Sequence, residues 1–242
     1  MLRTIIFYPC VVMTLVLSFI PSFRYRFVDS KPSNKKFNLS VYRISSAWAR
    51  LMMRLSGARI TVTGEEYLKE GETYLFVSNH QSNFDIPLLL SAIRCPKGFI
   101  AKKELGNIPI LTFWMKKIHC VFMDRDNIRK SAEAIVKGIQ ILKAGHSMVI
   151  FPEGTRSKGG PVKEFKAGSF KLALKSKVKI IPVTIDGSYK LLDANGGKIK
   201  AADVAVTLHE PIDVTTLSKE EIADLHNTVR DIVVSDLPEN QR

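Results

Sequence analysis

The sequence has few cysteines and histidines, and their spacing suits neither a disulfide framework nor a zinc centre. Its 242 residues include three cysteines, Cys10, Cys95 and Cys120, which leave one over and form no pair at metal-ligand spacing. The five histidines include no H-E-x-x-H or similar array. These absences favour a reducing compartment, and we expect no metal and no other cofactor.

Motifs of several other protein classes are also missing. We find no zinc-finger, RNP or basic-zipper pattern, no internal repeat, and no G-x-S-x-G turn of a serine hydrolase. The chain is nevertheless basic, with a formal net charge of +13, and residues 1–60 hold ten basic side chains but one acid. Because this charge lies beside an apolar segment, it indicates a phospholipid membrane surface as partner and not a nucleic acid.

The first apolar segment spans residues 4–20. It is interrupted by Thr4, Pro9, Cys10, Thr14 and Ser18. A spanning helix needs about 20 apolar residues, so this segment is short or tilted, or it lies partly in one leaflet. A signal peptide is the alternative, but no small-x-small cleavage site follows. We predict a retained membrane anchor, with the basic residues after it on the cytoplasmic face of a membrane, in a bacterium the inner membrane.

A second N-terminal helix is predicted at residues 40–55. Apolar side chains recur there at helical spacing, with Trp48 among them and with Arg43, Arg50 and Arg54 among the remaining positions. Such a basic amphipathic helix suits a membrane interface, although it suits packing on the domain equally well. We therefore predict membrane-anchoring helices in residues 1–56 and one α/β domain in residues 57–242.

The remainder of the chain alternates between predicted strands and helices. The apolar runs that predict strands are 58–64, 73–78, 97–104, 120–125, 148–151, 180–185 and 203–208. The helical patterns are 86–93, 108–117, 129–144, 165–176 and 219–234, the last preceded by a capping box of Ser218 and Glu221. This alternation predicts the α/β class: a single domain with a central, mostly parallel or mixed sheet flanked by helices. The helix 129–144 predicts a β-α-β unit in which the strands 120–125 and 148–151 pair in parallel.

The turn Asn79–Asp85 lies between a predicted buried strand and a helix. Five residues along a regular helix would set His80 and Asp85 roughly 140° apart, since each residue turns about 100°. If the backbone bends, Asp85 can accept one imidazole N–H and leave the other nitrogen to take up a proton. The alternative is that Asp85 caps the helix and His80 is an ordinary loop histidine.

A second loop, Phe-Pro-Glu-Gly-Thr-Arg-Ser at 151–157, follows another predicted strand. The N-H-x-x-x-x-D motif at 79–85 and this F-P-E-G-T-R-S motif together resemble the PlsC-type glycerolipid acyltransferases, most closely the 1-acyl-sn-glycerol-3-phosphate acyltransferases. Asp124-Arg125 and Pro182 resemble two weaker blocks of that family. The resemblance covers roughly residues 40–215.

The resemblance implies acyl transfer from acyl-CoA or acyl carrier protein to the free hydroxyl of lysophosphatidate, which gives phosphatidic acid. His80 would be the general base and Asp85 the residue that orients it. Glu153 would shape the acceptor pocket, accept a hydroxyl or pair with an arginine. The implied acceptor-binding residues are Arg125, Glu153, Gly154, Thr155 and Arg156.

Two lysine groups have open interpretations. The side chains of Lys102 and Lys103 would point toward the same site only if the strand ends before them, because neighbours on a strand point to opposite faces. Each is then a phosphate ligand or a solvated surface residue. The basic helix 165–176 is a docking face for an acidic carrier or, as we favour, a solvated surface.

Other functions fit the same residues. The acceptor could be glycerol 3-phosphate or another lysophospholipid, and a thioesterase would release thiol without any lipid acceptor. A membrane lipid-binding module without catalysis is a further alternative. The presence of both His80 and Asp85 argues against the last, since binding alone needs no base.

Overall fold

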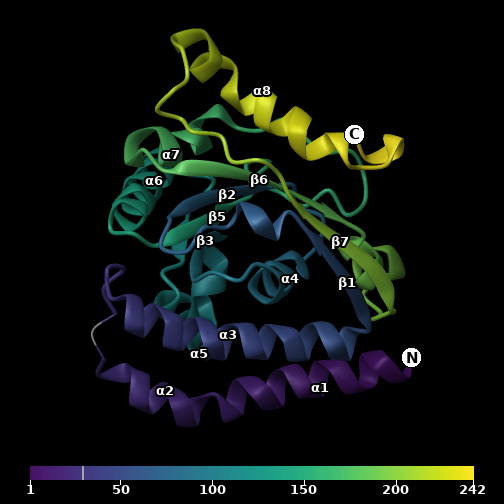
Figure 1. Ribbon diagram of the computed structural model, residues 1–242. Coiled ribbons are helices and arrows are strands. Elements are labelled where there is room, and N and C mark those ends of the chain that lie inside the picture. Colours follow the sequence, from purple (N-terminus) through teal and green to yellow (C-terminus); the bar gives the residue numbers. More distant parts are fainter. Residues whose placement is uncertain (29) are drawn as a thin grey trace.

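A seven-stranded mixed sheet forms the centre of the fold (Figure 1). The computed structural model describes residues 1–28 and 30–242. The strands are β1 (Ala58–Thr63), β2 (Tyr74–Ser78), β3 (Lys97–Lys102), β4 (Val121–Met123), β5 (Ser147–Ile150), β6 (Lys179–Asp186) and β7 (Ala202–Leu208), in the order β1-β7-β6-β2-β5-β3-β4. Strands β2 to β6 are mutually parallel, whereas β7 pairs antiparallel to β6 and parallel to β1. The predicted α/β class with a mostly parallel, mixed sheet is confirmed.

One predicted strand pairing is wrong. Helix α6 (Ile128–Lys143) does connect β4 to β5, but β3 lies between these strands and pairs with both. The reason lies in their burial: all of β5 is buried and takes a central place, whereas two of the three residues of β4 are only partly buried and this strand forms the edge. Because β2, β4 and β5 still run in one direction, the residues that follow them lie at the same edge of the sheet.

Helices cover both faces of the sheet (Figure 1). Besides α6 they are α1 (Leu2–Leu17), α2 (Phe19–Arg26), α3 (Lys35–Ser56), α4 (Asp85–Ala92), α5 (Pro109–Lys117), α7 (Lys171–Ser176) and α8 (Lys219–Ser235). Along β2, Tyr74 and Phe76 pack with α3 and α4, whereas Leu75 and Val77 pack with α6, α7 and α8. Each such side chain contributes about 1.5–3 kcal/mol when fully buried. Burial on both faces explains why the central strands are continuous apolar runs.

Several elements differ from their predicted bounds. Helix α3 begins before residue 40, because Asn34 caps it by accepting the amide N–H of Phe37 at 3.1 Å. Strand β3 ends at Lys102, before the predicted residue 104, and a 3-10 turn, η2 (Lys103–Asn107), follows. The predicted helix 165–176 begins as another 3-10 turn, η3 (Ala167–Phe170), so its first two residues are loop. The capping box before α8 is present as predicted.

The N-terminal apolar segment forms a helical stretch from Leu2 to Arg26 that lies along α3 (Figure 1). Its most apolar window of 18 residues has a mean hydropathy of 2.1, and the stretch is long enough to cross a membrane, longer than the predicted residues 4–20. The indole N–H groups of Trp48 and Trp114 donate to the hydroxyls of Thr14 at 3.2 Å and Ser18 at 3.0 Å. These two polar interruptions of the apolar run therefore mark the side of the helix that faces the domain.

Candidate active site

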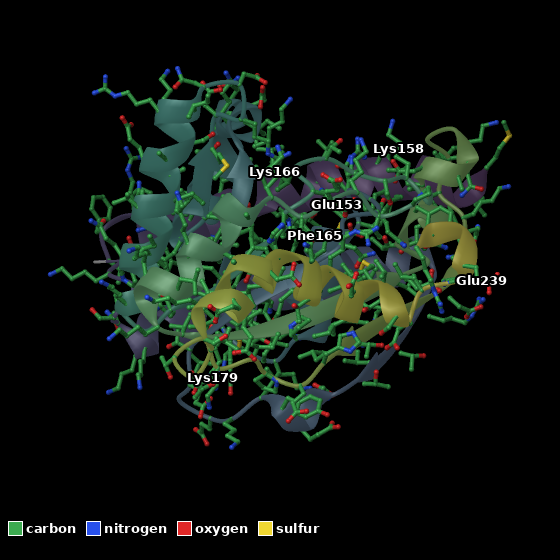
Figure 2. The ribbon with its side chains drawn as sticks, turned by 90° about the horizontal axis from the view of Figure 1, so that it is seen from above. Glu153, Lys158, Phe165, Lys166, Lys179 and Glu239 are labelled. Atoms are coloured by element: carbon green, nitrogen blue, oxygen red, sulfur yellow. The ribbon has the colours of Figure 1, made fainter. Side chains whose placement is uncertain are left out.

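The loops that follow the parallel strands meet at the carboxyl edge of the sheet. His80 follows β2, Arg125 follows β4, Glu153 follows β5 and Ser188 follows β6. Figure 2 shows Glu153 well separated from Lys179, the first residue of β6. Open α/β sheets bind their ligands at this carboxyl edge.

His80 and Asp85 are in direct contact, as the sequence predicts for a bent backbone. Nδ1 of His80 lies 2.7 Å from Oδ2 of Asp85. The carboxylate is fully buried, and its Oδ2 also accepts the backbone N–H groups of Gln81 at 2.7 Å and Ser82 at 3.0 Å. Ser188 donates its hydroxyl to the other oxygen, Oδ1. Since a carboxylate only accepts hydrogen bonds, it holds the imidazole proton on Nδ1 and leaves a lone pair on Nε2.

Asp85 does not cap helix α4. Phe84 is the N-cap residue, and the helix start has no side-chain cap. The Asp85 carboxylate instead turns back to N–H groups that precede the helix. Residues 79–84 are not helical, and this bend brings together two side chains that a regular helix would separate.

The imidazole of His80 is held on its face as well as at its edge. Its ring stacks on that of Phe151, with 4.2 Å between centroids and 17° between planes. The side chain is 14% exposed, and Nε2 makes no hydrogen bond with any residue the structure describes. An oriented imidazole whose other nitrogen is accessible and makes no hydrogen bond can remove a proton from an alcohol.

Glu153 ties the second motif to the first. It is buried, and its Oε1 accepts the backbone N–H of His80 at 2.7 Å while Oε2 accepts that of Lys163 at 3.1 Å. Burial raises the pKa of Glu153, and the two N–H groups oppose this shift. Within residues 1–28 and 30–242 neither oxygen contacts an arginine, so the predicted arginine pair is not formed.

Asp193 makes a second link between the motifs. Its two oxygens accept the Ser82 hydroxyl at 2.5 Å and Nη1 of Arg156 at 3.1 Å. The side chain of Arg156 remains 30% exposed. Thr155 is exposed, and its hydroxyl makes no hydrogen bond with a described residue. Of the adjacent residues Thr155 and Arg156, it is therefore Arg156 whose side chain is held in place by Asp193.

Two cations approach Gly154. Arg125 donates to its carbonyl oxygen, and burial lowers the pKa of Arg125. Gly154 has φ 72°, and a Cβ atom there would lie 3.0 Å from Nζ of Lys166, so this position favours glycine. The Lys166 ammonium makes no ion pair with the described part of the chain. Figure 2 shows Lys166 beside Phe165 and Glu153.

Lys102 and Lys103 have different partners. Nζ of Lys103 lies 2.9 Å from Asp124, next to Arg125, and this contact raises the pKa of Lys103. Nζ of Lys102 lies 3.3 Å from Glu104 in an exposed pair. The structure thus links Lys103, but not Lys102, to the segment that carries Arg125.

Sequence reasoning assigned no role to several residues around this site. They are Asn79, Ser188, Asp193 and Gln241, whereas Lys166 was considered only as part of the basic helix 165–176. The Asn79 amide binds the backbone N–H and carbonyl of Ile185, each at 2.8 Å, and so joins the ends of β2 and β6. For Ser188 one signal was available, because it follows the buried strand β6 as His80 follows β2. Gln241 gives no such signal, because its partner Gln81 is 160 positions away.

The fold is that of an α/β enzyme, and the edge of its sheet carries a histidine–aspartate dyad. A family model described as Acyltransferase matches residues 59–186, and the chain belongs to this family and is an acyltransferase.

Named relatives cover most of the chain. It is 34% identical over 191 residues to a 1-acyl-sn-glycerol-3-phosphate acyltransferase of Borreliella burgdorferi, which covers 79% of this chain and 76% of the relative. A probable 1-acyl-sn-glycerol-3-phosphate acyltransferase of Mycoplasma pneumoniae is 30% identical over 242 residues, which covers 95% and 88%. The crystal structure of the 1-acyl-sn-glycerophosphate acyltransferase PlsC from Thermotoga maritima matches with a TM-score of 0.82 and 29% identity, covering 96% of this chain and 92% of that one.

Proposed function

We propose that this chain transfers an acyl group from an acyl thioester to the free hydroxyl of 1-acyl-sn-glycerol 3-phosphate, which gives phosphatidic acid. The observation that carries the proposal is the 2.7 Å contact between His80 and Asp85, with Nε2 of the imidazole unbonded. The names of the relatives support the acceptor.

His80 acts as the general base. Its Nε2 removes the proton of the acceptor hydroxyl while the oxygen attacks the thioester carbonyl, and Asp85 stabilises the imidazolium that forms. The carbon–sulfur bond then breaks, and the imidazolium returns its proton to the leaving thiolate. The sequence has no G-x-S-x-G nucleophile, which favours direct transfer with both substrates bound.

The acceptor phosphate binds to the cations at the loop 151–157. Arg156 and Arg125 offer guanidinium groups, which bind phosphate through two donors at once. Lys166 adds an ammonium group close to Gly154. Because Asp193 already holds Arg156, this side chain is oriented before the substrate arrives.

The N-terminal helices, residues 1–56, anchor the catalytic domain, residues 57–242, to the phospholipid surface. The support is the outer side of α1 and α2, where the exposed apolar side chains include Ile5, Val12, Val16, Ile20 and Phe23. This surface buries apolar area in the bilayer while Thr14 and Ser18 face the domain. The basic residues that follow support a site on the cytoplasmic face, in a bacterium that of the inner membrane.

A thiol-release assay with a panel of acceptors tests the function. The purified protein in phospholipid vesicles receives acyl-CoA or acyl carrier protein, with lysophosphatidate, glycerol 3-phosphate, lysophosphatidylcholine or no acceptor. We expect thiol release and phosphatidate formation in equal amounts with lysophosphatidate. Equal release without an acceptor would instead show a thioesterase, and a higher rate with another acceptor would replace lysophosphatidate. The two donors, measured separately, identify the carrier that this chain uses.

A further inference from the structure

Gln241 contacts the loops that follow three strands of the sheet. Its side chain is 2% exposed, and its Oε1 accepts Nε2–H of Gln81, in the loop after β2, at 2.7 Å. Its backbone carbonyl accepts the N–H of Val162, in the loop after β5, at 3.0 Å. Its amide nitrogen lies 3.5 Å from Oδ1 of Asp186 and 3.4 Å from the hydroxyl of Tyr189, at the end of β6.

The orientation of this amide follows from its neighbours. The carboxylate of Asp186 only accepts, so the Gln241 nitrogen faces it and Oε1 faces the donor Nε2 of Gln81. Gln81 is 1% exposed, and water cannot take over this bond. Loss of the Gln241 oxygen would leave a buried amide donor without a partner, which is more costly than losing an exposed hydrogen bond.

Two chains of hydrogen bonds lead from Gln241 to the dyad. In the first, the backbone N–H of Gln81 donates to Oδ2 of Asp85 at 2.7 Å. In the second, Val162 is followed by Lys163, whose N–H binds Glu153, and Glu153 in turn binds the backbone N–H of His80. Each member of the dyad thus depends on a loop that Gln241 holds.

We propose that Gln241 is a positioning residue for acyl transfer, which keeps the His80 and Asp85 loop in register with the Glu153 loop. The proposal rests on the function proposed above. Gln241 touches neither reacting atom, so it acts on the rate of the chemical step through the geometry of the dyad. Small displacements of catalytic groups lower rates strongly even when substrates still bind.

The substitution Gln241→Met tests this proposal, because it keeps a similar side-chain length and removes the amide. The matched control is Asn240→Ala, which deletes the adjacent amide, exposed and without a side-chain hydrogen bond to a described residue. We expect about a tenfold lower kcat for Gln241→Met, with KM for both substrates changed less than about twofold. Asn240→Ala should match the wild type.

A double-mutant cycle separates positioning from general support of the fold. If Gln241 acts through Gln81, the double variant Gln81→Met, Gln241→Met has a kcat no lower than that of the more impaired single variant. Losses that multiply would overturn the proposal. Should Gln241→Met not fold, Gln81→Met alone removes the same bond from the other side, and a kcat equal to that of Asn240→Ala would overturn it.

The activity of the wild type distinguishes a failure of the proposed function from a failure of the positioning role of Gln241. A wild type that releases no thiol with lysophosphatidate contradicts the proposed function itself. An active wild type with a Gln241→Met variant of equal kcat contradicts only the positioning role.

Discussion

Two histidine sites lie at opposite edges of one sheet and differ in their partners. At the carboxyl edge, His80 has a buried carboxylate on one nitrogen, and its other nitrogen has no hydrogen-bond partner among the described residues. At the amino edge, His119 and His146 precede β4 and β5, with 4.5 Å between their ring centroids. Nε2 of His119 donates to Oδ1 of Asn38 at 2.8 Å, whereas Nε2 of His146 is buried without a partner.

The amino-edge pair shows what burial does to histidine without an acid. Burial, with the nearby charge of Lys117, lowers the pKa of His119 to about 4. Burial, with the neighbouring His119 and Lys97, lowers the pKa of His146 to about 3. In the part of the chain described here, neither ring contacts a carboxylate. The comparison teaches that a catalytic histidine needs an oriented proton on one nitrogen and access to the other, and burial alone supplies neither.

The largest expected effect is the loss of the base. His80→Ala should lower kcat about 10²–10⁴-fold, the usual contribution of a general base. His146→Gln, which changes the buried pair at the other edge, should keep kcat within about threefold of wild type in the folded protein. Both are measured by thiol release with lysophosphatidate, after circular dichroism has confirmed folding. Near-normal turnover of His80→Ala would show that His80 is not the general base.

The buried pair should instead control stability in acid. The folded pKa values near 4 and 3 lie below the ordinary value of 6.5, so below about pH 6.5 the unfolded chain binds more protons. The free energy of unfolding is therefore highest above that pH. It decreases as the pH falls toward 4, by at most about 1.4 kcal/mol per pH unit for each histidine. Urea unfolding at pH 7, 6 and 5 measures this slope. The His119→Gln, His146→Gln double variant should flatten it, and an unchanged slope would contradict the assignment.

A smaller effect is expected at Ser188, which supports the acid of the dyad. Ser188→Ala removes the hydroxyl that donates to Oδ1 of Asp85 and should lower kcat about tenfold, since the carboxylate loses one orienting bond. Ser235→Ala is the control, because among the described residues that exposed hydroxyl donates only to the backbone carbonyl of Ile232 in helix α8. Equal rates for the two variants would show that Asp85 needs no support from β6.

The smallest effect is expected at the two adjacent lysines. Lys102→Ala should change kcat and KM less than about twofold, because its pair with Glu104 is exposed. Lys103→Ala should raise KM for lysophosphatidate about threefold or more, because Lys103 holds Asp124 beside Arg125 and adds positive charge there. A larger loss with Lys102→Ala would reverse this assignment.

Local patterns in the sequence were sufficient for the class and the elements. Apolar runs and helical spacing predicted the strands and helices, and the two motifs at 79–85 and 151–157 predicted the family. The prediction failed at the pairing of β4 with β5, because strand order depends on how much apolar surface each strand can bury on both faces. The predicted start of helix α3 was wrong because the N-cap residue Asn34 lies before the predicted range.

The sequence by itself determined the two short motifs, with His80 and Asp85 in one and Glu153 and Arg156 in the other. Only the tertiary structure decided how they are held. Ser188, Asp193 and Gln241 reach the site from distant parts of the chain, and their contacts exist only once the strand ends have assembled at one edge. The physical reason is that a buried polar group must find a partner wherever folding places one, whatever their separation in sequence.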